Sequence, residues 1–202
     1  MEELPARYPV NLEVDYPERL DRFTTFFRLI VAIPIVVILG FLMAGNARTG
    51  YGFPWYVFFP TVLMLLFRHK YPRWWFDWNV ALISFAARVS AYLTLLRDEY
   101  PSTDEAQAVH LQIPYPDVQR ELSRGLPLVK WLLAVPHYVV LVFLGVAALV
   151  VIIIAWFAIL ITTRYPRGLF DFVVGVLRWK LRVYAYAFLL TTDRYPPFRL
   201  SP

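Results

Sequence analysis

The sequence predicts an all-α membrane protein with four transmembrane helices, arranged as two hairpins in an internal pseudo-twofold repeat. Two interfacial amphipathic helices and a small cytoplasmic two-strand element complete the predicted fold. Composition is the first observation behind this prediction, because the 202 residues are 59% hydrophobic and 17% charged, with a mean hydropathy of +0.51. The others are a set of long apolar runs and the return of first-half landmarks in the second half. Soluble domains have roughly 45–50% apolar and about 25% charged residues, so an ordinary soluble enzyme is excluded.

An alternating segment near the start of the chain returns after its midpoint. Residues 10–18 read VNLEVDYPE and residues 109–117 read VHLQIPYPD. Both alternate apolar and polar side chains, which is the period of a half-buried strand, and both end at Tyr-Pro, where proline stops a ladder. We expect strands at 9–16 and 109–115 that pair with each other, because neither satisfies its backbone groups alone.

The first predicted hairpin follows the first strand. Residues 26–44 form a nineteen-residue run with one charge, Arg28, at its start. At ~1.5 Å per residue, such a helix crosses a hydrocarbon core of ~30 Å. Residues 53–67 are fewer, but their aromatic start suits the membrane interface. We therefore predict two spans here.

The second predicted hairpin comes from the longest apolar run. Residues 127–163 hold only Lys130 and His137 as ionisable groups over thirty-seven positions. A single helix of that length would measure ~55 Å, nearly twice the bilayer core. The run therefore predicts two spans joined by a tight turn near Gly145.

The basic residues predict the orientation. The two hairpin tips, residues 45–52 and the turn near Gly145, hold only Arg48 of the 20 Lys and Arg. The positive-inside rule then places both termini and the middle segment in the cytoplasm of a multi-pass protein of the cell (plasma or inner) membrane. The net charge of +5 favours anionic lipid over nucleic acid as the partner.

Further landmarks match between the two halves in the same order. Arg28 and Pro34 correspond to Lys130 and Pro136, so each half has proline inside its first span. The other matches are residues 70–77 with 164–171, and residues 95–101 with 189–196. Matches in one order over the whole chain indicate an internal repeat.

These matches define the predicted organisation of the chain. Residues 1–101 form the first repeat, residues 102–106 an exposed joint, and residues 107–202 the second repeat. Each repeat is expected to contain a strand, two spans and an interfacial helix.

The last helix of each half is the element whose place is open. Residues 172–190 combine an apolar stripe with three central cations, which favours a helix lying in the interface over a span. Residues 78–96 have only Arg88 near their centre and are compatible with either arrangement. Because a spanning helix there would move basic residues outside, we favour the interface and parallel repeats.

Three segments carry a family resemblance. They are YPVNLEVDYPER at 8–19, FRLIVAIP at 27–34 and AVPHY at 134–138. These segments resemble a family of small prokaryotic integral membrane proteins, catalogued as domain of unknown function 4389, in two tandem copies. The resemblance implies an integral membrane protein and no established activity. The first half has Ile35 where the second has His137.

The candidate site residues are basic and tyrosine side chains near the predicted cytoplasmic face. The first set recurs at helical spacing in both halves and consists of Arg88, Tyr92, Arg178, Arg182 and Tyr186. The second set lies at the ends of predicted spans and consists of Arg68, Lys70, Arg73, Arg164 and Arg167. Both suit lipid headgroups or a protein partner, but interfacial charges, ion pairs between halves and snorkelling topology determinants explain them equally.

Other polar residues have structural explanations. Asp77 and Asp171 follow a proline and precede an apolar-periodic run, where N-caps are expected. His137 follows Pro136, and its imidazole N–H suits the backbone carbonyl that this proline frees. The paired carboxylates at 98–99 suggest surface charge. With no cysteine, no phosphate-binding loop and no nucleophile motif, we expect no enzyme, no cofactor and no metal.

The predicted function is therefore that of a non-catalytic membrane scaffold or accessory subunit, which binds lipid or a protein partner at the cytoplasmic face. Membrane phospholipids, a second copy or a larger membrane complex are the expected partners, and nucleic acid is not. The alternative is lipid handling, as a scramblase or lipid carrier, through the charged inner face and the groove between the repeats.

Overall fold

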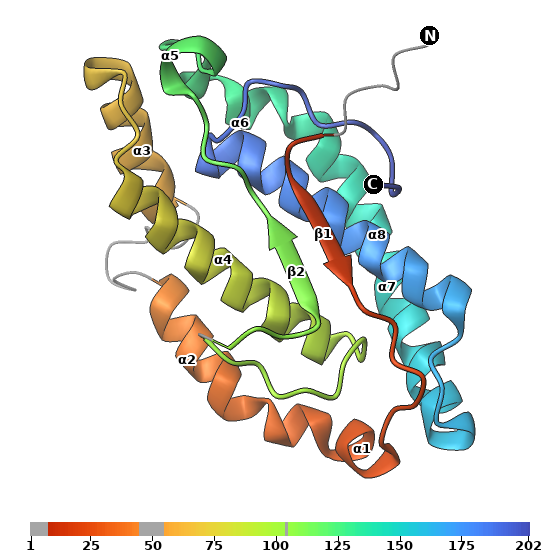
Figure 1. Cartoon of the computed structure of the whole chain (residues 1–202). Helices are drawn as coiled ribbons and strands as arrows, with labels where there is room; N and C mark the ends of the chain where they lie inside the picture. Colours follow the sequence, from red (N-terminus) through yellow and green to blue (C-terminus); the bar gives the residue numbers. More distant parts are fainter. Residues whose placement is uncertain (1–7, 45–54, 104) are drawn as a thin grey trace, which may run out of the picture.

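The computed structural model describes residues 8–44, 55–103 and 105–202. These residues are mainly helical, with one small two-stranded sheet (Figure 1). The predicted first hairpin tip at 45–52 lies outside the described residues, as does Asp104 of the predicted joint. A predominantly helical chain with two short strands is as the sequence predicted.

Twelve elements follow each other along the described residues. In chain order they are β1 Asn11–Val14, α1 Arg22–Val31, α2 Ile33–Ala44, α3 Trp55–Arg68, α4 Arg73–Leu93, β2 Val109–Gln112, α5 Val118–Glu121, a 3₁₀ turn Leu126–Leu128, α6 Lys130–Leu133, α7 Val135–Thr162, α8 Arg167–Tyr184 and a π-helical turn Ala185–Leu189. Helix starts follow local signals: Asp21 caps α1 by accepting from the Thr24 N–H at 2.8 Å, and Pro72 and Pro166 directly precede α4 and α8.

The two strands pair with each other, as predicted. β1 and β2 are antiparallel, with Leu12 opposite Leu111 and Val14 opposite Val109. Figure 1 shows both strands lying over α4 and α8. β1 packs against α8 and β2 packs against α4, so each strand rests on a helix from the other half of the chain.

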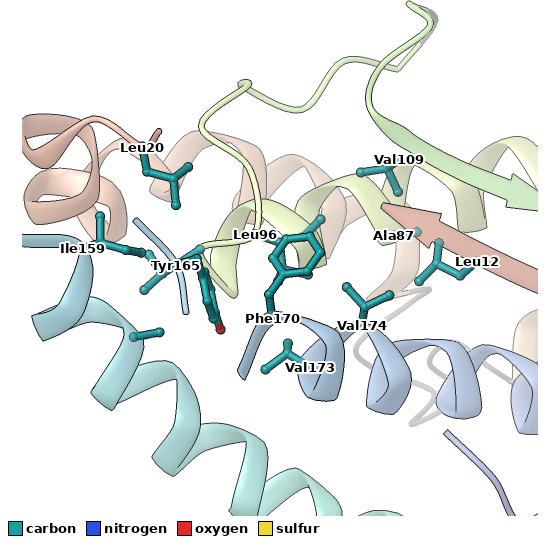
Figure 2. Packing of buried hydrophobic residues seen from close by; sticks show 13 residues of the cluster. Leu12, Leu20, Ala87, Leu96, Val109, Ile159, Tyr165, Phe170, Val173 and Val174 are labelled. Atoms are coloured by element: carbon teal, nitrogen blue, oxygen red, sulfur yellow. The ribbon is translucent and has the colours of Figure 1, made fainter. Parts of the chain in front are cut away.

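The remaining helices extend this exchange between the halves. α7 packs along α8, and α1 of the first half packs against α7. In the other direction, α3 contacts the π-helical turn that follows α8. The largest buried cluster sits where these elements meet and includes Leu12, Leu96, Phe170 and Val174 (Figure 2).

The prediction of four spans is not confirmed. Among the described residues, only α7 is long and apolar enough to cross a membrane, and α1 with α2 would add a second span if this pair, bent by 43°, counts as one. The apolar part of α3, Val57–Arg68, is a shorter helix. Neither α4 nor α8 meets this test, so spanning by residues 78–96 is not supported.

The predicted turn near Gly145 is wrong, because α7 runs unbroken through that residue. A lone glycine inside a helix costs only about 1 kcal/mol, which a long apolar helix tolerates. The long run is divided instead at Ala134, where α6 ends and Pro136 occupies the first turn of α7. Proline lacks the amide that would continue the preceding helix, but it fits a first turn. At ~1.5 Å per residue, α7 measures about 42 Å and needs tilt or protruding ends in a bilayer.

Replacing Leu12 with Asp should test the packing of the sheet on the helices. Leu12 is 1% exposed, so an unpaired carboxylate there should cost several kcal/mol of unfolding free energy. The matched control is Gln112→Asp, because Gln112 is exposed on the other strand. Thermal unfolding in detergent should show a large loss for the first variant and little change for the second; equal losses would contradict this packing. The alternation of apolar and polar residues in β1 predicts an outward-facing Asn11, but Asn11 is 3% exposed, so it is unsuitable as the control.

Candidate functional site

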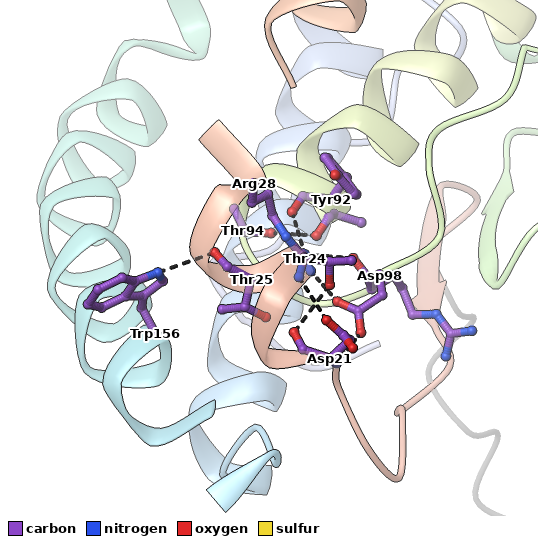
Figure 3. Close-up of polar contacts among 10 residues, drawn as sticks. Asp21, Thr24, Thr25, Arg28, Tyr92, Thr94, Asp98 and Trp156 are labelled. Atoms are coloured by element: carbon purple, nitrogen blue, oxygen red, sulfur yellow. Dashed lines mark hydrogen bonds and ion pairs between the residues drawn. The ribbon is translucent and has the colours of Figure 1, made fainter. Parts of the chain in front are cut away.

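A buried arginine lies in the last turn of α1, just before the bend between α1 and α2. Arg28 is 1% exposed and forms an ion pair with Asp98, which follows α4 (Figure 3). Its Nη1 donates to the carbonyl oxygens of Tyr92 at 2.9 Å and Arg97 at 2.7 Å, and its guanidinium lies 4.6 Å from the centre of the Tyr92 ring. The other Asp98 oxygen accepts from the backbone N–H of Asp21, the N-cap residue of α1, at 2.7 Å.

A buried lysine takes the corresponding place in the second half. Lys130 is fully buried, and its Nζ lies 2.6 Å from Asp193 Oδ1 and donates to the Thr192 carbonyl at 2.7 Å. The Nζ is 5.2 Å from the centre of the Tyr186 ring. Burial lowers the pKa of Lys130, and Asp193 acts in the opposite direction. The Asp193 carboxylate also accepts from the Ser123 N–H at 2.7 Å.

Each cation joins an interrupted helix to a segment of its own half: Arg28 to the segment after α4, and Lys130 to the segment after α8 and its π-helical turn. Arg28 lies four residues before the break at Ala32, and Lys130 lies four residues before the break at Ala134. The interpretation of Asp98 as a solvated surface charge is therefore wrong. A guanidinium buried to this degree needs a nearby carboxylate, and the turn after α4 brings Asp98 to it.

Arg178 and Arg182 brace β1 instead of facing outward. Arg178 Nε donates to the Leu12 carbonyl at 2.8 Å and its Nη1 to the Leu200 carbonyl at 2.9 Å. Arg182 is fully buried, and its Nη1 donates to the Ser201 carbonyl at 2.9 Å. The placement of these arginines on an exposed interfacial face is corrected: they satisfy carbonyl groups on the outer edge of a strand and in the C-terminal segment.

The other predicted site residues that recur in both halves, Tyr92, Tyr186 and Arg88, also point toward the interior of the protein. Tyr92 is 3% exposed and Tyr186 is 2% exposed, each beneath its buried cation. Arg88 is half-buried and donates to the Ser102 carbonyl at 2.8 Å. The structure therefore does not gather Arg88, Arg178 and Arg182 into one exposed stripe, because the two on α8 are held by β1.

Arg73 and Arg167 take part in two matching contacts between the halves. The Arg167 guanidinium lies 4.4 Å from the centre of the Tyr16 ring, and that of Arg73 lies 4.7 Å from the Tyr115 ring. The two tyrosine hydroxyls donate across the halves as well, to the carbonyls of Tyr165 and Tyr71. Each strand end is thereby fastened to the helix start of the other half.

The carboxylates next to these arginines do not cap helices. Asp77 is 3.3 Å from Arg73, and Asp171 is 3.4 Å from Arg167, each one turn along its helix. The caps are Pro72 and Pro166, so the N-cap prediction is wrong. Proline starts each helix one turn earlier than the apolar periodicity indicated, which leaves the aspartates inside the second turn.

Arg68, Lys70 and Arg164 are exposed near the ends of apolar helices. Arg68 is the last residue of α3, and Arg164 follows α7 by two positions. Of the ten predicted site residues, these three keep their side chains on the surface outside the contacts described above. They are positioned to meet headgroups or solvent.

His137 lies at the junction of α7, α8 and the C-terminal segment. Its Nδ1 accepts from the Trp179 Nε1–H at 3.0 Å, and its ring stacks on Phe198 with centroids 3.9 Å apart. The imidazole therefore packs between elements and does not serve the carbonyl freed by Pro136. Within the described ranges, no cluster of three or more His, Cys, Asp or Glu side chains is placed to hold a metal ion.

The dominant surface feature is an apolar face spread over α1, α2 and α7. Only 11% of the most apolar stretch of α7 is buried. The exposed large apolar side chains are Phe23, Phe26, Leu29, Ile30, Val31, Ile33, Val36, Val37, Ile38, Phe41 and Leu42 on α1 and α2, and Val135, Val139, Val142, Phe143, Val146, Leu149, Val150, Ile153, Ile154, Phe157 and Ile161 on α7. Monomeric soluble proteins rarely expose apolar patches beyond a few hundred Å².

Sequence reasoning missed Arg28, Lys130 and their aspartates as a buried set. The signal was present, because both cations precede a proline by six residues and both aspartates closely follow a matched leucine pair. Taken from the sequence alone, this pattern indicates only the repeat. Pairing each cation with its carboxylate needs the fold, since about seventy residues separate Arg28 from Asp98.

Comparison with known proteins gives one match. Residues 127–199 match a family model described as Domain of unknown function (DUF4389), in one copy. The matched stretch includes α6, α7 and α8, and thus Lys130, Asp193 and the arginines that brace β1. No curated protein and no solved structure matches the chain.

Removing one partner of the Lys130–Asp193 pair should show how much the pair contributes to the free energy of unfolding. Asp193→Asn leaves a fully buried ammonium without its carboxylate and should cost about 3–5 kcal/mol of unfolding free energy. Lys130→Met should cost less, because Asp193 keeps partial exposure and the Ser123 N–H. The double variant should resemble Lys130→Met. Arg120→Gln, at an exposed ion pair, is the control and should change stability by under ~1 kcal/mol. Additive losses in denaturant titrations would contradict direct coupling.

Proposed function

We propose that this chain is a non-catalytic integral membrane protein that binds lipid and serves as a scaffold or accessory subunit. The observation that carries the proposal is the exposed apolar face of α1, α2 and α7. The core helix of a soluble protein is mostly buried, whereas α7 turns most of its apolar surface outward. In the hydrocarbon core of a bilayer such an apolar surface avoids contact with water without being buried by other protein.

The charged residues fit this proposal. The buried cations are paired with carboxylates and backbone carbonyls of the protein itself, so their role is to stabilise the fold. The exposed Arg68, Lys70 and Arg164 lie next to the ends of apolar helices, where long basic side chains reach the headgroup region. These positions favour contact with anionic phospholipids at one face of the membrane.

The proposal extends to the number of membrane spans and the side of the membrane on which the termini lie. We infer a multi-pass protein in which α7 and the bent α1–α2 pair both enter the bilayer, with both termini cytoplasmic in accordance with the basic residues. We also infer that the two halves are copies of one unit. The matching contacts of Tyr16 with Arg167 and Tyr115 with Arg73 support this inference.

Lipid handling, as a scramblase or carrier, is the second candidate function. The observation in its favour is an apolar pocket of about 370 Å³ between α4 and α8, with α2 at one side. Small-molecule pockets typically measure about 300–1,000 Å³. Purified protein in vesicles that carry a fluorescent lipid on one leaflet separates the two functions, because only a lipid-handling protein should speed its exchange between leaflets.

An arginine in the middle of α7 tests membrane insertion. Leu149 is 59% exposed, so Leu149→Arg should leave the packing of a soluble protein intact. In a membrane-crossing helix the same change should cost about 2.5–3.5 kcal/mol of insertion free energy. The measurement is the fraction of protein that resists alkaline carbonate extraction from membranes. Gln119→Arg, on the exposed side of α5, is the matched control. A wild-type chain that is extracted as a monomer would overturn the proposal.

A further inference from the structure

Two apolar pockets lie on either side of α8. The first is the pocket of about 370 Å³ between α4 and α8, lined by Leu39 of α2, Ala86 of α4 and Leu181 of α8, with Leu12 of β1 also in its wall. The second, of about 390 Å³, lies between α7 and α8 and is lined by Leu141, Gly145 and Val183 among others. In Figure 1, α8 runs between α7 and the sheet with α4.

Lys180 belongs to the lining of both pockets. It is exposed on α8, and Tyr184 one turn later is the other residue common to both linings. Its neighbours on α8, Arg178 and Arg182, donate hydrogen bonds to backbone carbonyls of the protein. In the described part of the chain, Lys180 makes no ion pair. The helix thus presents one ammonium between two apolar slots.

We propose that α8 carries a binding site for one anionic phospholipid with two acyl chains. The Lys180 ammonium binds the phosphate, and one acyl chain lies in the slot on each side of the helix. This inference rests on the proposed function, because a membrane-embedded α7 and α2 place both slots in contact with lipid. It adds a defined site, a charge requirement and a chain number to that proposal.

The chemistry favours this occupant over others. An amphiphile with one negative charge and separate chains complements a lone cation between two apolar slots. The α7–α8 slot borders the exposed apolar face, since Val142 in its lining is 64% exposed. The α4–α8 slot borders it through the half-buried Leu39 and Met43 of α2. A second copy of the chain would instead bring its own apolar face and leave the ammonium without a counter-charge.

The charge requirement is tested by Lys180→Gln, with Arg124→Gln as the matched control. Arg124 is also exposed, but it follows α5 and belongs to the lining of neither slot. Protein extracted from bilayers of equal phosphatidylcholine and phosphatidylglycerol is examined by native mass spectrometry for retained lipid. Wild type and Arg124→Gln should retain phosphatidylglycerol preferentially. Lys180→Gln should retain about fivefold less phosphatidylglycerol than wild type, because one lysine contributes about 1 kcal/mol to the binding of an anionic lipid.

The chain number is tested by filling one slot at a time. Gly145→Leu should fill the α7–α8 slot and Ala86→Leu the α4–α8 slot. Gly40→Leu on α2 is the control for Gly145→Leu, because a side-chain atom added at either glycine meets nothing within 4 Å and only Gly145 lines a slot. In an equal mixture of phosphatidylglycerol and its single-chain lyso form, each filled slot should shift retention from the two-chain to the single-chain lipid by severalfold.

The outcomes separate this inference from the proposed function. Unchanged retention in Lys180→Gln, or an equal loss in Arg124→Gln, would overturn the site and leave the proposed membrane location intact. Retention of single-chain lipid by wild type as strongly as two-chain lipid would overturn it too, as would a lipid-free oligomer with α8 at its interface. If the wild type does not remain in membranes, the proposed function fails first.

Discussion

The buried ion pairs of Arg28 with Asp98 and Lys130 with Asp193 hold the structure in its shape. In each pair the cation lies four residues before a helix break and the carboxylate follows α4 or α8, with a tyrosine ring beside the cation. Buried charges of this kind fix geometry more than they add stability, because their attraction mainly offsets the cost of removing them from water. The helices can then place their apolar sides outward without losing their mutual arrangement.

The two-stranded sheet depends on that arrangement. Two strands of four residues are marginal by themselves, and here they gain support by packing on helices from the opposite halves. Arg178 donates to the Leu12 carbonyl of β1, and Arg182 donates to the Val10 carbonyl directly before the strand. Basic residues that look like ligand-binding groups in the sequence are therefore part of the scaffold, which changes where a ligand site is to be sought.

That scaffold leaves two kinds of surface for function. One is the apolar face of α1, α2 and α7, which suits hydrocarbon, and the other is the pair of slots beside α8 with Lys180 between them. In both cases the proposed partner is lipid: at the apolar face it acts as a solvent, and at the slots it binds as a specific ligand. The buried pairs and the braced strand keep α8 in place between the slots, which is the positioning that a specific lipid site requires.

The sequence by itself determined the helical class, the pairing of the two strands and the apolar character of the surface, because composition and periodicity act locally. It did not locate the helix breaks at Ala32 and Ala134, although each of them precedes a proline by two residues. Only the tertiary structure decided that α7 is one helix through Gly145 and that Asp98 serves a buried arginine. Both depend on neighbours distant in the chain: a lone glycine stays helical when its flanks are strongly helical, and a carboxylate is solvated or paired according to which cation the fold brings to it.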